Sequence, residues 1–169
     1  EVRLPRVLVG MLAGFGLAVG GVILQSLVRN PLASPDVVGV TKGAGFAAAL
    51  AIFLFPTAPS YLLPAAAFAG ALSAFILLAV LSRKFRLSPA TLALVGVAIG
   101  ALFQAGTQYL IVTHPSNVQA ALLWLSGSLW SRSWREMFSL LPWLAALLPL
   151  AWAGFAKLNV LQLGDETPV

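Results

Sequence analysis

Residues 7–28 read VLVGMLAGFGLAVGGVILQSLV, an apolar run without a single charged side chain. A helix needs roughly 20 mostly apolar residues to cross the hydrocarbon core of a bilayer. Four later stretches have the same character, at 37–55, 62–81, 89–112 and 137–156. We predict a helix for each stretch, because a lone strand in lipid leaves its backbone groups without hydrogen bonds. The predicted fold class is all-α, a polytopic bundle of about five membrane-spanning helices.

The composition supports a membrane protein. Of the 169 residues, 60% are hydrophobic and only 9% are charged, whereas a soluble domain carries about 25% charged residues. The chain contains no cysteine, which excludes a disulfide framework and a thiolate metal site. Its net charge of +5 is too scattered for a phosphate-binding stripe. We therefore expect the lipid bilayer and other proteins as partners, and no nucleic acid.

The basic residues predict an orientation. Those on one side of the five predicted helices are Arg29, Lys42, Arg83, Lys84, Arg86 and Lys157, and those on the other side are Arg3, Arg6, Arg132 and Arg135. Lys and Arg are more frequent in cytoplasmic connectors, so the first side is predicted to be cytoplasmic. Arg3 and Arg6 then face the exterior, against the general tendency, which makes them candidates for a specific role.

The residues needed for chemistry are missing from the predicted spans. Every acidic residue lies outside them, which argues against a proton relay through these helices. The one histidine, His114, lies in an exterior connector without a partner for a metal site. The sequence has no HExxH, GxSxG or phosphate-cradling loop. We expect no catalytic residue, no metal and no cofactor, and therefore no enzyme.

Small residues recur every four positions in the first and fourth spans, which is typical of closely packed helices in lipid. These residues are Gly10, Gly14, Ala18, Gly16, Gly20, Gly96 and Gly100. The glutamines Gln25, Gln104 and Gln108 lie on the same helix faces as some of them. Such a face would suit the lining of a pathway for a bulky solute, but hydrogen bonds between helices explain the glutamines equally well.

Four sequence blocks resemble one family. They are RLPR at 3–6, QSLVRNPLASPDVVGVTKGAG at 25–45, WLSGSLW at 124–130 and LNVLQLGDE at 158–166. In order and spacing they are similar to the FecCD/BtuC-like permease subunits of ATP-binding-cassette (ABC) importers for ferric siderophores, haem and cobalamin. The resemblance covers essentially the whole chain. It implies a ten-helix type II importer permease, of which this chain holds about the second to sixth helices.

The resemblance also implies residue roles. Arg3 and Arg6 match arginines that dock an acidic solute-binding protein, and contact with lipid headgroups is the alternative. Asn30, Pro31 and Leu32 match a cytoplasmic gate, to which Leu87 and Ser88 add weaker candidates; a plain helix-joining turn is the alternative. Leu163, Gly164, Asp165 and Glu166 match the start of a segment, 163–169, that couples to the ATPase. Because the chain begins without Met and ends in a polar stretch, we interpret it as a piece of a longer protein.

The predicted function is thus that of a permease subunit in the bacterial cytoplasmic (inner) membrane. It would translocate an iron(III)-siderophore or related metal chelate, with WLSGSLW favouring a siderophore. The implied partners are a separate ABC ATPase subunit, a periplasmic or lipoprotein solute-binding protein and a second permease subunit, either identical or a sister chain. The alternative is a secondary transporter driven by an ion gradient, which predicts an ion site of broken helices or intramembrane carboxylates. A membrane-embedded enzyme is a third class, which the lone histidine disfavours.

Overall fold

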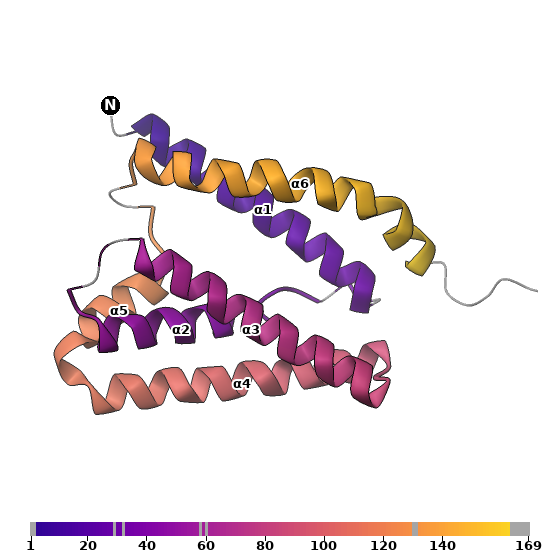
Figure 1. The fold of residues 1–169 in the computed structure, drawn as a ribbon, viewed down its shortest axis with the longest axis horizontal. Helices are drawn as coiled ribbons and strands as arrows, with labels where there is room; N and C mark the ends of the chain where they lie inside the picture. Colours follow the sequence, from indigo (N-terminus) through magenta and orange to yellow (C-terminus); the bar gives the residue numbers. More distant parts are fainter. Residues whose placement is uncertain are drawn as a thin grey trace, which may run out of the picture. The chain divides into compact units, whose positions relative to one another are not determined.

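The computed structural model describes residues 3–28, 30–31, 33–57, 59, 61–129 and 132–162, with side chains described up to residue 154. Every regular element in these ranges is a helix, which confirms the all-α prediction. The elements are α1 (Arg3–Val28), α2 (Val40–Leu54), α3 (Leu62–Phe85), α4 (Pro89–Thr113), the short 3₁₀ helix η1 (Pro115–Asn117), α5 (Val118–Leu125) and α6 (Trp134–Gln162) (Figure 1).

Four helices of the described chain are long and apolar enough to cross a membrane: α1, α3, α4 and the Trp134–Gly154 part of α6. They overlap four of the predicted spans. The second predicted stretch, 37–55, differs from the prediction of a full span. Its helix α2 has 15 residues and rises only about 22 Å, against about 30 Å of hydrocarbon.

A turn before α2 explains its late start. Residues 35–39 form this turn, which ends at Gly39 with a φ of 84°. Glycine adopts this left-handed conformation without a steric penalty. The carbonyl oxygen of Pro35 accepts hydrogen bonds from the amides of Val40 (3.1 Å) and Thr41 (3.3 Å), and so closes the turn onto the helix. The predicted span therefore begins as a turn and becomes helical only at Val40.

The chain divides into two compact units. The first contains Glu1–Ser34 and Leu129–Val169, with α1 and α6 packed on each other. Gly16 of α1 allows close contact with α6, because a Cβ atom at this position would lie 3.1 Å from Cδ2 of Leu144. Two internal prolines, Pro142 and Pro149, each remove one backbone hydrogen bond from α6.

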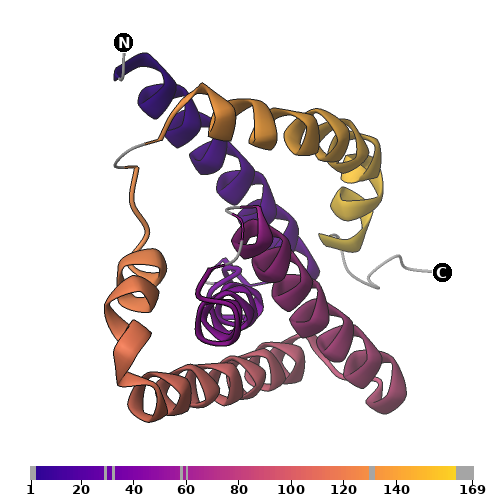
Figure 2. The same ribbon diagram turned by 60° about the vertical axis from the view of Figure 1, so that its left-hand side comes forward.

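The second unit, Pro35–Ser128, is built around α2. Figure 2 shows α2 nearly end-on, with α3 and α4 beside it, and both helices contact it. The core of this unit combines residues of α2, α4 and α5: Ala49, Ile52, Phe53, Leu110 and Ala121. The short helix α5 lies in the connector between the fourth and fifth predicted spans.

Candidate functional site

The two candidate docking arginines lie in the first turn of α1. The helix begins at Arg3, before the predicted span start at residue 7. Pro5 does not prevent this early start, because proline is tolerated in the first turn of a helix. Arg3 is exposed, Arg6 is half-buried and Pro5 is buried. A spacing of three residues puts both arginines on the same side of the helix. Two cations at a helix N-terminus oppose the helix dipole, so they do not stabilise α1 itself. An anionic partner outside the helix would suit them better.

Two of the three predicted gate residues of the first unit, Asn30 and Pro31, lie in the turn that follows α1. The Asn30 amide donates to the Gln25 carbonyl at 3.2 Å, and the Asn30 carbonyl accepts from the Ala33 amide at 3.1 Å. Asn30 is half-buried and Pro31 is exposed. Leu32, the third predicted residue, lies outside the described residues. The structure thus shows a hydrogen-bonded turn here, and the role of a gate stays a prediction.

The other candidate gate residues belong to the second unit, in the turn between α3 and α4. Arg86 ends α3 in the left-handed conformation, with a φ of 47°, and the Leu87 amide donates to the Ser82 carbonyl at 3.2 Å. Ser88 is the N-cap of α4, where its hydroxyl accepts from the amide of Thr91 at 3.3 Å. This capping role was not predicted from the sequence, although serine directly before proline is a typical start signal for a helix.

The candidate lining residues Gln25, Gln104 and Gln108 are all exposed. Gln25 lies on α1, and the other two lie one turn apart on α4. On α1, a Cβ atom at Gly14 or Gly21 would meet no other atom within 4 Å. This stripe of α1 is therefore open within the described structure, and its use as a pathway lining stays a prediction.

The glycines of α4 pack as the small-residue pattern predicts, but against the start of α2 and the preceding turn. A Cβ atom at Gly96 would lie 3.0 Å from Cα of Val38, and one at Gly100 would lie 3.1 Å from Cα of Gly39. A Cβ at Gly100 would also lie 3.2 Å from Cδ of Lys42. From the sequence, Lys42 was assigned to the cytoplasmic side. In the structure it lies in the first turn of α2 with its side chain against Gly100 of α4, and the side of the membrane that it faces stays a prediction.

His114 ends α4 and contacts two neighbours. Its Nδ1 lies 2.8 Å from the hydroxyl of Thr113, and its ring lies 5.4 Å from that of Phe53, centroid to centroid. Within the described ranges, no three His, Cys, Asp or Glu side chains gather into a possible metal site.

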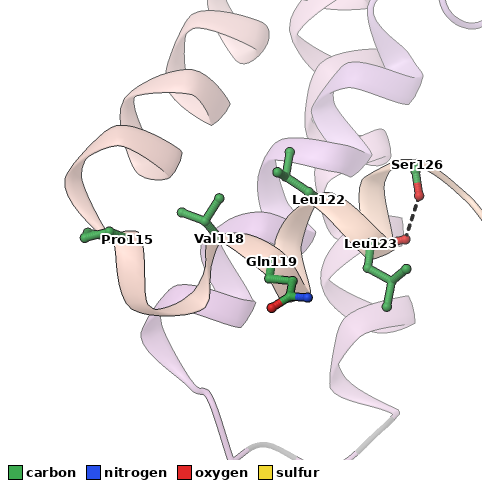
Figure 3. Close-up of a pocket in the computed structure, with 6 residues that line it drawn as sticks. All are labelled: Pro115, Val118, Gln119, Leu122, Leu123 and Ser126. Atoms are coloured by element: carbon green, nitrogen blue, oxygen red, sulfur yellow. Dashed lines mark hydrogen bonds between the residues drawn. The ribbon is translucent and has the colours of Figure 1, made fainter.

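A shallow open groove of about 570 Å³ runs over α5 (Figure 3). Its lining residues are Pro115, Val118, Gln119, Leu122, Leu123 and Ser126. The Ser126 hydroxyl donates to the Leu123 carbonyl at 2.9 Å, and Gln119 is the other polar side chain that lines the groove. No residue of the groove was a candidate from the sequence. The coupling residues Leu163, Gly164, Asp165 and Glu166 lie outside the described residues.

The fold and these sites define a multi-pass, all-helical membrane protein. The sequence model of the "FecCD transport family" matches residues 1–169. The chain belongs to the FecCD transport family, as the four sequence blocks predicted.

Individual relatives agree with this assignment. The chain is 51% identical to the Fe(3+)-citrate import system permease protein YfmE of Bacillus subtilis, over 98% of this chain and 50% of the relative. It is 44% identical to the Fe(3+) dicitrate transport system permease protein FecD of Escherichia coli, over 98% of this chain and 51% of the relative. The chain thus spans about half the length of the curated relatives it matches.

A solved structure has the same fold. It is described as an inward-facing conformation of a metal-chelate type ABC transporter, and it matches with a TM-score of 0.80 at 31% identity. The match covers 98% of this chain and 53% of the solved chain.

Proposed function

We propose that this chain is part of the membrane-spanning permease of an ABC importer that carries an iron(III)-siderophore or related ferric chelate across the bacterial cytoplasmic membrane. The observation that carries the proposal is the family match over the whole chain, together with the 31% identical metal-chelate transporter of the same fold. Relatives at 51% and 44% identity are named for ferric citrate. Other relatives are named for achromobactin and for iron hydroxamates, which suggests ferric chelates as the substrate class.

The importer would work through partner proteins. A separate ATPase subunit would hydrolyse ATP, a solute-binding protein would deliver the chelate, and a second permease chain would complete the pathway. Arg3 and Arg6 support the docking of an acidic binding protein, because arginine pairs with carboxylates through two directed hydrogen bonds. Residues 163–166 would begin the contact with the ATPase.

Each unit, taken by itself, carries candidate residues for the pathway. Gln25 on α1 and Gln104 and Gln108 on α4 offer uncharged polar side chains that suit weak contacts with a large solute. The turns around Asn30–Leu32 and Leu87–Ser88 would form the cytoplasmic gate. In the described parts of these turns, hydrogen bonds and prolines restrict the backbone conformation. Such a restricted backbone suits a gate that returns to the same closed conformation.

Uptake into proteoliposomes tests this function. The full-length permease would be reconstituted with its ATPase, a loaded binding protein and ⁵⁵Fe-labelled chelate, with ATP inside the vesicle. We expect uptake that needs ATP and stops when the catalytic glutamate of the ATPase is replaced. Uptake that survives this replacement and collapses with the ion gradient would instead establish the secondary transporter.

A further inference from the structure

Lys42 lies opposite the middle of a membrane-length helix. Its Cδ atom lies 3.2 Å from the position that a Cβ atom at Gly100 would occupy. Gly100 follows Pro89, the first residue of α4, by 11 residues, which is about 17 Å along the helix axis. The whole of α4, 25 residues, is about 37 Å long. The Cδ atom of Lys42 therefore packs near the midpoint of α4, about equally far from its two ends.

The backbone before Lys42 is not helical at this depth. Val38 is 1% exposed and packs on Gly96, whereas Asp36 on the same turn is exposed. Non-helical backbone at membrane depth occurs only where it is buried in protein or lines a water-filled cavity. One side of the turn is buried in protein, because α4 covers Val38. The other side carries the carboxylate of Asp36, which needs water. The exposed side of the turn before Lys42 therefore suits an aqueous path and not lipid.

Within the described chain, Lys42 forms no hydrogen bond and no ion pair, and its side chain is half-buried. Asp36 is the one acidic residue in the sequence of the second unit, and the structure shows no ion pair between it and Lys42. A charged side chain inside a membrane is costly, and such residues usually mark the path of an ion or substrate. The charge of Lys42 thus lacks a partner in its own unit.

The polar surroundings of Lys42 fit an anionic solute. The first amides of α2, those of Val40 and Thr41, already donate to the Pro35 carbonyl and are not available to a ligand, whereas the ammonium group of Lys42 is a charged donor. Gln104 lies one helical turn beyond Gly100 on the same side of α4, and Gln108 one turn beyond that. Lys42 would therefore stand at one end of a polar row along α4.

We propose that the ammonium group of Lys42 binds a carboxylate oxygen of the ferric chelate as it passes through the membrane. This rests on the proposed function and narrows its substrate to chelates with free carboxylates. Lipid phosphate could offer the same anionic oxygen, but headgroups lie at the membrane surface, about 15 Å from the bilayer midplane. The aliphatic stem of Lys42, held against Gly100, would keep the ammonium group on the exposed side of α2.

The first test uses the absence of cysteine from this chain. In the full-length protein with any cysteines outside this segment replaced, Lys42→Cys is reconstituted in nanodiscs with its ATPase. We expect a small water-soluble thiol reagent to label it, and ferric citrate to slow the labelling. Lys84→Cys at the exposed end of α3 is the reactive control, and Ala49→Cys, at 0% exposure, is the unreactive one. Labelling no faster than at Ala49→Cys would overturn the proposal. The proposal would also be overturned if the labelling rate of Lys42→Cys depended on the phosphatidylglycerol content of the nanodiscs and not on ferric citrate.

The second test is uptake. Lys42→Met keeps the length of the stem and removes the charge, and we expect ferric citrate uptake to fall about tenfold, as for the loss of one charge-assisted hydrogen bond. Lys42→Arg should retain most of the uptake. Copurification with the ATPase shows that each variant is assembled. Equal uptake by Lys42→Met and the unmodified protein would overturn the proposal for Lys42. If the unmodified protein showed no ATP-driven uptake, the proposed function would be refuted, and the labelling test would still be valid.

Discussion

Gly43 of α2 and Gly70 of α3 lie so close together that neither position has room for a side chain. A Cβ atom at Gly43 would lie 2.7 Å from the carbonyl oxygen of Gly70, and a Cβ at Gly70 would meet the carbonyl oxygen of Gly43 even more closely. In lipid, helix association depends on van der Waals packing, which such small residues permit. The pair thus holds the short helix α2 against a full-length neighbour.

Replacing Gly70 should therefore destabilise the second unit. We expect Gly70→Ala to cost about 1–3 kcal/mol, because the new methyl group overlaps the α2 backbone and forces α2 and α3 apart. Gly20→Ala in α1 is the matched control, since its Cβ would meet no atom within 4 Å. Thermal unfolding of the purified protein in detergent, followed by the fluorescence of its tryptophans, measures both variants. A Gly70→Ala protein as stable as the control would contradict the close contact.

The start of α6 offers a test of a helix cap. Glu136 Oε2 accepts from the Ser133 amide at 2.7 Å and from its hydroxyl at 2.6 Å, and the Arg135 amide donates to Ser133 Oγ at 3.3 Å. These bonds form a capping box. We expect Ser133→Ala to cost about 1 kcal/mol and to speed hydrogen exchange in the first turn of α6. The control is Ser139→Ala, whose hydroxyl bonds only to the Arg135 carbonyl within its helix.

Docking at the N-terminus of α1 can be tested by charge reversal. In the full-length protein, Arg3→Glu combined with Arg6→Glu should weaken the binding of the solute-binding protein, most strongly at low salt, because exposed charges are screened as ionic strength rises. Arg3→Lys with Arg6→Lys keeps the charge but loses the paired hydrogen bonds of the guanidinium group, so we expect intermediate binding. Surface plasmon resonance on nanodiscs measures the dissociation constants. Docking that is unaffected by charge reversal at every salt concentration would exclude this role.

The sequence predicted the helices well because lipid leaves a long apolar segment few alternatives to helix formation. It did not predict the short α2, because residues 37–39 are as apolar as the helix that follows. The deciding interactions are the left-handed Gly39 and the Pro35 carbonyl, and both depend on the folded turn. Pro35 and Gly39 were visible in the motif, and together they could have indicated a turn.

The glycines show a second limit of the sequence. Gly14 and Gly70 both lie in apolar helices, yet a Cβ at Gly14 would meet nothing within 4 Å and one at Gly70 would overlap another backbone. Their difference arises from tertiary neighbours, which a repeat of small residues does not reveal. The same holds for Lys42, whose position against Gly100 follows from the offset between α2 and α4. Candidate site residues could thus be listed from motifs, but their neighbours had to come from the structure.

Ser88 shows how a structural role can be separated from a role in gating. Its hydroxyl accepts from the Thr91 amide and lies 2.8 Å from the Thr91 hydroxyl, so Ser88→Ala should cost about 1 kcal/mol through loss of the N-cap alone. Asparagine caps helices as well as serine does, so Ser88→Asn should restore the midpoint of thermal unfolding. If Ser88 also contributes to the gate, the larger asparagine should still change the rate of ATP-driven uptake at restored stability. Full recovery of both quantities would limit Ser88 to capping, and unchanged stability of Ser88→Ala would contradict the cap.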